Sequence, residues 1–364
     1  MTGIRPLVEA HGIWRGTGAQ ASTVCSCASA RALAIRAAAA LLFVSAFGGA
    51  GGCALQPPAD AFPVELPESL DASRPLAVIG DLQQTRAFVR WARERESTAE
   101  EQPVLIADLH TRIDEIAGLV IVGDLVYTSG SRSDWRHFDE LIAPLARSVP
   151  VLPAIGNHDY YCVLMQKCLH HVVPKEFRLR FPWFAPGQPY AVAYGDVVLA
   201  FLDSETELEA QGAWLEQRMT EWAPTYRAVL IFLHRAPFTD TVGRSEGPDL
   251  AVQERIVSRL KGRAPLPVVI TGHIHGYEHL VVDGTHYVVT AGGGGPRTML
   301  AADRPSDVYR GPECSHDELG QVQRPFNYLL IERRTAAIGF TVRGFCAETD
   351  DVSVIESFEI SVSR

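Results

Sequence analysis

Three features are scarce in this 364-residue chain: positive charge, cysteine, and apolar runs long enough to cross a membrane. Lys and Arg number 33 against 43 Asp and Glu, giving a formal net charge of -10. Proteins that bind nucleic acid without sequence preference need a basic surface to displace counterions. The acidic balance therefore argues against nucleic acid as a partner and against a polyanionic substrate.

A phosphate-binding P-loop is also missing. The run THYVVTAGGGGP (285–296) ends a predicted strand in glycines, but no Lys-Ser or Lys-Thr pair follows it. Glycines at such a place allow close backbone approach and positive φ angles. We therefore expect a tight loop beside a site rather than a nucleotide cradle.

The beginning of the chain is typical of an export signal. Arg31 and Arg36 precede the apolar run AAAALLFVSAF (37–47), which is too short to span a bilayer, and small residues follow. This pattern predicts a signal peptide over 1–53, a linker over 54–74 and one domain over 75–364. The exported protein would be periplasmic, membrane-anchored or secreted.

Cys53 directly follows two glycines, which indicates a lipoprotein signal and membrane attachment through a lipidated Cys53. Ala50 stands where such signals usually have Leu, so ordinary secretion is the alternative. Four later cysteines favour two disulfides in an oxidising compartment, although buried free thiols are also an option. Of the three possible pairings, 162–168 with 314–346 is the most economical.

Five apolar segments, each ending in a polar residue, carry the main functional signal. Such segments are typical of strands buried on both faces that deliver side chains at their carboxyl ends. They read PLAVIGDLQ (75–83), LVIVGDLVY (119–127), VLPAIGNHD (151–159), AVLIFLH (228–234) and PVVITGHIH (267–275).

The polar residues at these ends are metal-ligand types, namely Asp81, Asp124, Asn157, His234, His273 and His275. Carboxylate, amide and imidazole ligands together suit Zn, Fe or Mn. Six ligands exceed what one ion with an open position needs. The set therefore predicts two neighbouring ions, an arrangement used for displacement at phosphorus.

The order Asp, Gly-Asp, Gly-Asn-His-Asp, His, Gly-His-x-His resembles the calcineurin-like metallophosphoesterase superfamily over roughly residues 75–300. The resemblance implies a four-layer α/β/β/α sandwich of two mixed sheets with a dinuclear metal site. It also implies that Asp81, Asp124 and His275 hold one ion. Asp124 would bridge to a second ion completed by Asn157, His234 and His273.

The same resemblance implies a phosphomonoesterase or phosphodiesterase in which a hydroxide generated by the ions attacks phosphorus. His158 would protonate the leaving group, and Asp159 would fix its orientation. The alternative is a binding scaffold of the same fold without catalysis. Such scaffolds lose the GNH histidine, whereas this chain keeps His158, which favours catalysis.

Two positions set this chain apart within the superfamily. GDLVY and GHIHGYE look like the purple acid phosphatase branch, in which the tyrosine is a ferric ligand. Tyr127 is therefore either a phenolate ligand or a packing residue with a bonded hydroxyl. Gln83 stands where the superfamily has His and the purple branch has Gly, and its amide is a weaker ligand or holds a water.

The Asp-x-His form of the first motif occurs instead at Asp108-Leu109-His110, which lies too close to Asp124 for a parallel crossover. Apolar residues at helical intervals predict instead a helix over 103–117 with Asp108 and His110 on its solvated face. Another helix is expected around 83–97. Further on, we expect a strand pair over 190–205 ending at a structural Asp203, a helix over 211–222, and antiparallel strands over 327–334, 337–345 and 352–361.

Overall fold

The computed structural model describes residues 55–84, 97–163, 166–167, 175–241, 247–297, 324–346 and 351–362, together with Cys314 and Thr349. Every described residue belongs to one compact unit of the chain, Cys53–Arg364. The predicted signal segment 1–53, including Cys53, thus lies outside the described residues. Among those that are described, no helix is both long and apolar enough to span a bilayer.

One sheet has seven strands in the order β1-β7-β8-β9-β10-β12-β11. Strands β8, β9, β10 and β12 run parallel, whereas β7 and β11 pair antiparallel with β8 and β12. The strands are β1 (Ser69–Leu70), β7 (Tyr190–Tyr194), β8 (Val197–Phe201), β9 (Ala228–Leu233), β10 (Leu266–Thr271), β11 (Tyr277–Val282) and β12 (Thr285–Thr290).

The other large sheet has six strands in the order β15-β14-β13-β2-β3-β4. Strands β2, β3 and β4 are parallel, and β13, β14 and β15 extend the sheet antiparallel, as predicted. The strands are β2 (Leu76–Ile79), β3 (Gly118–Val122), β4 (Val151–Ala154), β13 (Phe326–Arg333), β14 (Ala337–Phe345) and β15 (Ser353–Ser361). A separate short hairpin consists of β5 (Tyr161–Val163) and β6 (Gln166–Lys167).

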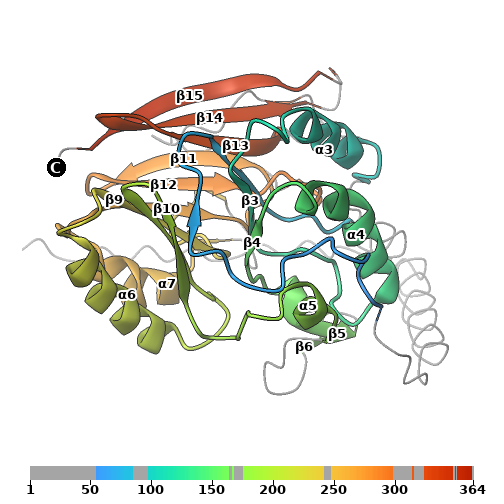
Figure 1. Cartoon of the computed structure of the whole chain (residues 1–364), viewed down its shortest axis with the longest axis horizontal. Coiled ribbons are helices and arrows are strands. Elements are labelled where there is room, and N and C mark those ends of the chain that lie inside the picture. Colours follow the sequence, from blue (N-terminus) through green and yellow to red (C-terminus); the bar gives the residue numbers. More distant parts are fainter. Residues whose placement is uncertain are drawn as a thin grey trace, which may run out of the picture. The chain divides into compact units, whose positions relative to one another are not determined.

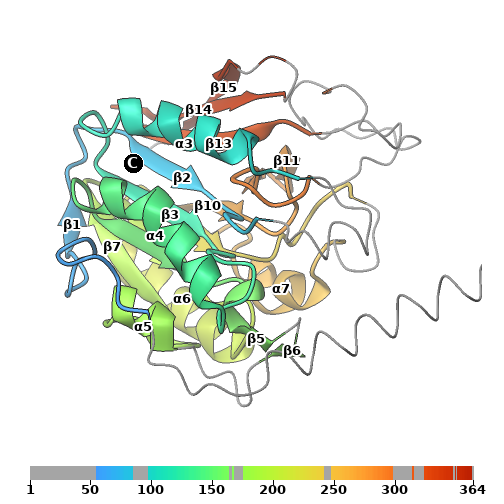
Figure 2. The ribbon, with the colours of Figure 1, turned by 90° about the vertical axis from the view of Figure 1, so that its right-hand side faces the viewer.

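Helices cover the outer face of each large sheet. Helices α3 (Glu101–Thr111) and α4 (Arg132–Ala146) lie over β2 and β3, whereas α6 (Leu208–Trp222) and α7 (Leu250–Arg255) lie beside the seven-stranded sheet (Figures 1 and 2). Within the described residues, the other helical segments are α5 (Lys175–Arg180) and the 3-10 turns η1 (His158–Tyr160) and η3 (Val257–Arg259).

Three hydrophobic clusters separate these layers. The cluster between the sheets includes Val78, Val120 and Phe232. The two outer clusters lie under α3 and α4 and under α6 and α7. The order helix, sheet, sheet, helix confirms the predicted α/β/β/α sandwich.

Local sequence explains why the helices form where they do. Ser131 caps α4, because its hydroxyl accepts from the backbone N–H of Asp134 at 3.4 Å. Trp135, Phe138 and Ile142 then bury one face of the helix. The predicted helix over 211–222 is α6, which begins at Leu208. Asp203 is a structural residue, as predicted, because its carboxylate accepts the Tyr160 hydroxyl at 2.5 Å.

The described part of the predicted linker, residues 55–74, packs onto the domain. The Phe62 ring lies 5.9 Å from that of Phe138 and 5.6 Å from that of Phe181. Leu70 is buried on β1, which pairs with β7. The apolar residues of this segment follow no regular period, so the sequence pattern did not reveal their packing.

Two elements differ from their predicted form. The helix expected over 103–117 is α3, which ends at Thr111, so that Ile116 and Ala117 approach β3 instead. Strand β11 was not predicted, although Asp283-Gly284 is a typical hairpin turn and both residues have positive φ angles, 50° and 79°. Most of the helix expected around 83–97 lies outside the described residues.

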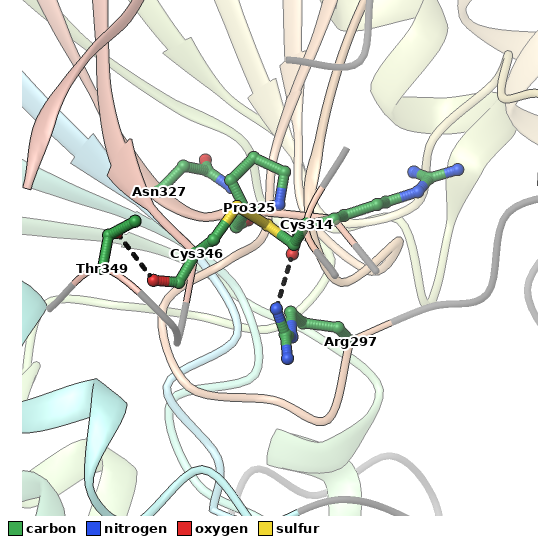
Figure 3. Close-up of a disulfide and its surroundings, with 7 residues drawn as sticks. Arg297, Cys314, Pro325, Asn327, Cys346 and Thr349 are labelled. Carbon is green, nitrogen blue, oxygen red and sulfur yellow. Dashed lines mark hydrogen bonds between the residues drawn. A yellow bond between two sulfur atoms is a disulfide. The ribbon is translucent and has the colours of Figure 1, made fainter. Parts of the chain in front are cut away.

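The predicted Cys314–Cys346 disulfide is present, with its Cα atoms 5.2 Å apart. Figure 3 shows this bond beside Pro325, Asn327 and Arg297. The Arg297 guanidinium donates to the Arg324 carbonyl at 3.1 Å, which ties the end of the glycine run to the start of β13. Cys162 is also disulfide-bonded, and its predicted partner Cys168 lies outside the described residues.

Candidate metal centre

The predicted ligands follow the carboxyl ends of five strands in the two sheets. β2, β3 and β4 lead to Asp81, Asp124 and Asn157, and β9 and β10 lead to the three histidines. Within each sheet a backbone bond joins neighbouring loops, from the Asp81 N–H to the Gly123 carbonyl at 3.1 Å and from the Gly272 N–H to the His234 carbonyl at 3.0 Å. Between the sheets, the His273 N–H donates to the Asp81 carboxylate at 3.0 Å. The two sheets therefore deliver their ligands to one place.

The side chains form two groups that share one carboxylate. The first ligand group is Asp81, Asp124 and His275, and the second ligand group is Asp124, His234 and His273. Within each group, one ligand atom per residue lies within 4.8 Å of the others. This arrangement fits the predicted division into two neighbouring ion sites with Asp124 between them.

Three of these residues have a backbone that side chains other than glycine seldom adopt. The φ angles are 59° at Asp81, 53° at Asp124 and 70° at His273. Each such residue costs about 1–3 kcal/mol, and residues of this kind concentrate at functional sites. A Cβ on Gly156 would lie 2.2 Å from Asp124 Oδ1, so glycine is required for the close approach.

Backbone carbonyls orient two of the histidines. His234 Nδ1 lies 2.9 Å from the Val122 carbonyl, and His275 Nδ1 lies 2.6 Å from the Pro296 carbonyl. The Nδ1 atoms must carry the protons, because a carbonyl only accepts. The Nε2 atoms then face the carboxylates, with His234 Nε2 3.3 Å from Asp124 and His275 Nε2 3.3 Å from Asp81.

Asn157 is oriented by Tyr161. The Asn157 amide donates to the Tyr161 hydroxyl at 3.3 Å, and its Oδ1 lies 3.1 Å from His234 Nε2. The oxygen, which is the ligand atom of an amide, therefore faces the second ligand group. Sequence reasoning missed Tyr161, and only its position after the GNHD segment could have indicated it.

His158 stands beside the shared carboxylate. Its backbone N–H donates to Asp124 Oδ1 at 2.8 Å, and its ring Nδ1 lies 2.7 Å from the Tyr127 carbonyl. The rings of Tyr127 and Tyr161 flank the imidazole at centroid distances of 4.9 and 5.0 Å. The imidazole is thus held so that Nε2 is the nitrogen left for a substrate.

The predicted role of Asp159 is wrong in one respect. Its carboxylate accepts the backbone N–H groups of Leu125 and Gly156, both at 2.9 Å, and does not orient His158, since the Tyr127 carbonyl does so. Asp159 instead joins the loops that carry Asp124 and Asn157. The Tyr127 ring packs on His158, and metal binding by its hydroxyl stays a prediction.

Gln83 lies inside the first ligand group and is buried. Its Nε2 is 3.1 Å from Asp124 Oδ2 and 3.2 Å from His275 Nε2, whereas its Oε1 has no hydrogen-bond partner. A buried amide oxygen without a partner is unfavourable, and rotation of the amide exchanges oxygen and nitrogen. The position thus fits the predicted role of Gln83 as a ligand or water holder.

Burial and mutual charge shift the proton affinities of the cluster. Burial raises the pKa of Asp81, and the neighbouring histidines offset only part of this effect. Burial acts in the same direction on Asp124, but His234 and His158 outweigh it and hold its pKa far below the usual range. Burial alone would lower the pKa of His234. The negative charge of Asp124 outweighs burial and raises the pKa of His234 to about 10.

His273 shows the opposite shift. Unlike His234, which would release a proton on binding an ion, His273 has a neutral ring, because its burial and the charge of His234 hold its pKa well below the usual range. Arg235 approaches its outer side, with Nη1 3.5 Å from His273 Nε2, and pairs with Glu205 at 2.5 Å. Sequence reasoning missed this pair, because nothing but the adjacency of Arg235 to His234 marks it.

The family model for calcineurin-like phosphoesterases matches residues 74–277, more than half of the chain. A curated relative, the probable inactive purple acid phosphatase 9 of Arabidopsis thaliana, is 20% identical over 280 residues. The match covers 67% of this chain but only 41% of the relative.

Similar solved structures show the same fold. The purple acid phosphatase PPD1 of yellow lupin has a TM-score of 0.54 at 19% identity, covering 81% of this chain and 55% of that one. GAP50, described as the anchor in the inner membrane complex of Plasmodium, has a TM-score of 0.52 at 11% identity, covering 80% and 89%. A dimetal phosphatase of Danio rerio has a TM-score of 0.50 at 13% identity, covering 80% and 100%. On the strength of the family model, the chain belongs to the calcineurin-like phosphoesterases.

Proposed function

We propose that this chain is a metal-dependent hydrolase of small phosphomonoesters or phosphodiesters. The observation that carries the proposal is the pair of ligand groups sharing Asp124. When bound there, two Zn, Fe or Mn ions would stabilise charge on the phosphoester oxygens and lower the pKa of a water. Asp81, His275 and Gln83 would hold one ion, and Asn157, His234 and His273 the other, with Asp124 between them.

The residues of the chain supply the proton. With its ring in the imidazolium form, His158 donates the Nε2 proton to the departing oxygen and becomes the neutral Nδ1–H tautomer. The Tyr127 carbonyl, 2.7 Å from Nδ1, stabilises that tautomer and fixes the ring. The flanking tyrosine rings further limit its rotation.

A non-catalytic scaffold is the competing proposal, since one similar protein is described as probably inactive and another as an anchor. This chain, however, keeps His158 beside both ligand groups. Its ring is held by the Tyr127 carbonyl and by two tyrosine rings, which is the restraint that a proton donor needs. The arrangement therefore favours catalysis.

The full chain, loaded in turn with Mn, Zn and Fe, should hydrolyse p-nitrophenyl phosphate or bis(p-nitrophenyl) phosphate. The ratio of the two rates assigns monoester or diester preference. Asp124→Asn should lose both ions and turnover together, because a neutral amide cannot balance two cations. Full metal content without hydrolysis of either substrate would support the scaffold instead.

Export and lipidation form a separate part of the proposal, supported by the Cys314–Cys346 disulfide and by the leader sequence. In a bacterial host, a fatty-acid analogue should label the precursor, and Cys53→Ser should abolish the label. An unlabelled, soluble wild-type product would favour ordinary secretion.

The acidic chain is expected to take a small phosphoester and no nucleic acid.

A further inference from the structure

Gln102, in the first turn of α3, joins two loops at the metal centre. Its side chain is fully buried, and Nε2 donates to the Leu82 carbonyl at 2.7 Å and to the Gly293 carbonyl at 3.0 Å. These acceptors lie 20 and 191 residues away in the sequence. Both amide protons are thus used to connect distant segments of backbone.

Each acceptor belongs to a loop that controls the first ligand group. Leu82 lies between Asp81 and Gln83, and the glycine run continues to Pro296, whose carbonyl orients His275 at 2.6 Å. A Cβ on Gly295 would lie 2.8 Å from the His275 ring, so this backbone also forms the wall behind that imidazole. The Gly295 N–H further donates to the Asp81 carbonyl at 2.8 Å.

The amide of Gln102 has only one workable orientation. His137 Nε2, on α4, lies 2.6 Å from Gln102 Oε1. Rotation of the amide would place its oxygen against two carbonyl oxygens and its protons against the His137 donor. Contact with the glycine run is also close, since a Cβ on Gly294 would lie 2.0 Å from Gln102 Nε2.

We propose that Gln102 is a positioning residue for the first ligand group. Through the Leu82 and Gly293 carbonyls it holds the Asp81 loop and the loop behind His275 at a fixed separation. The inference rests on the proposed metal-dependent function. Residues beyond the ligands that orient a metal site commonly change metal affinity by about 10- to 100-fold when they are replaced.

The second ligand group is held mainly by other contacts. His234 is held by the Val122 carbonyl, and Asn157 is held by the Tyr161 hydroxyl. Its one direct link to the Asp81 loop is the His273 N–H, which donates to the Asp81 carboxylate at 3.0 Å. A defect at Gln102 should therefore weaken the first ion far more than the second. A general loss of stability would weaken both.

Gln102→Met keeps the length of the side chain and removes both donors. In the Mn-loaded full chain, we expect the wild type to bind two ions per chain and to show an exchange-coupled EPR signal. The variant should bind the first ion about 10- to 100-fold more weakly and the second within about twofold. Its EPR signal should become that of an isolated Mn ion.

Asp108→Asn is the matched control, because Asp108 anchors the same helix to Arg343 and Tyr328 without touching either loop. It should keep both ions within about twofold of wild type. If Gln102→Met does not fold, His137→Leu removes the bond that orients the amide and should give a smaller loss at the same ion.

Wild-type affinity for both ions in a folded Gln102 or His137 variant overturns the positioning role. Equal weakening of both ions does the same. A wild-type chain that binds two ions but hydrolyses no phosphoester refutes the proposed function and leaves this inference standing. A wild-type chain that binds no Mn refutes both.

Discussion

Asp81-Leu82-Gln83 and Asp108-Leu109-His110 are similar in sequence and opposite in surroundings. Asp81 follows a parallel strand with a φ of 59°, and among the described residues its ionic neighbour is His275 rather than Arg or Lys. Asp108 lies on α3, where Arg343 binds it with two bonds of 2.9 Å and Tyr328 donates at 2.5 Å. A carboxylate with its own permanent cation has no need of a metal, whereas a buried carboxylate without one does.

The contrast extends to protonation. Burial raises the pKa of Asp81. Burial alone would also raise the pKa of Asp108. The hydrogen bonds from Arg343 and Tyr328 outweigh burial, so the pKa of Asp108 is lowered. Location at a strand end, and not the Asp-x-His pattern itself, distinguishes the metal residue from the structural one.

Among the tests of this comparison, the largest effect is expected for Asp81→Asn. The variant should lose the first ion and reduce turnover on the order of 1,000-fold, because several kcal/mol of transition-state stabilisation depend on that ion. Metal content and turnover of p-nitrophenyl phosphate measure both effects. Asp108→Asn, made in parallel, should retain them; loss of an ion there would show that the two segments had been assigned to the wrong roles.

His158→Ala comes next. It should keep both ions and lower turnover by about 100-fold for alkyl phosphates, with a smaller loss for nitrophenyl phosphates, whose leaving group departs unprotonated. His110→Ala, at the exposed position of the counterpart segment, should change neither rate. Equal losses on both substrate types would contradict the role of His158 as the proton donor.

A third carboxylate, Asp203, accepts hydrogen bonds from the Tyr160 hydroxyl and from two backbone N–H groups, and it sharpens the comparison through pH. Burial raises its pKa to about 6, although hydrogen bonds from Tyr160, Glu205 and Gly187 favour the charged form. Because the folded pKa exceeds the unfolded one, this contribution is fully present below about pH 4 and is lost as pH rises through 6. The full difference is at most about 3 kcal/mol.

Unfolding by urea at several pH values should show this loss in the wild type and not in Asp203→Asn. The informative quantity is the difference in unfolding free energy between the two proteins. A constant difference from pH 4 to pH 7 would place the pKa of Asp203 near its ordinary value.

The smallest expected effect is on stability at Asp108. Asp108→Asn should lower the free energy of unfolding by about 1.5 kcal/mol at neutral pH, the low end for bonds to a charged group, since the pair is partly exposed. Its pKa is lowered by folding, so its stabilisation is present above about pH 4 and declines below it. A urea midpoint unchanged by the substitution would mean that α3 is held by its apolar face alone.

The sequence revealed the strands and their polar ends because both follow regular local patterns. It did not reveal β11, although the Asp283-Gly284 turn precedes β12, or the packing of Phe62, whose neighbours follow no period. Gln102 could not be recognised at all, since its meaning depends on a carbonyl 191 residues away. The role of Asp159 was misjudged for a similar reason: its partners are backbone N–H groups, which no side-chain motif records.

Each ligand group draws residues from both sheets: Asp81 and Asp124 follow strands of the six-stranded sheet, and the histidines follow strands of the seven-stranded sheet. A bound ion is therefore a further cross-link between layers that also meet through apolar contacts and through a few hydrogen bonds, such as that from the Tyr190 hydroxyl to the Pro153 carbonyl. By mass action, an ion at 100 times its dissociation constant stabilises the folded state by about 2.7 kcal/mol. The supply of metal in the surroundings of this protein would then set its lifetime as well as its activity.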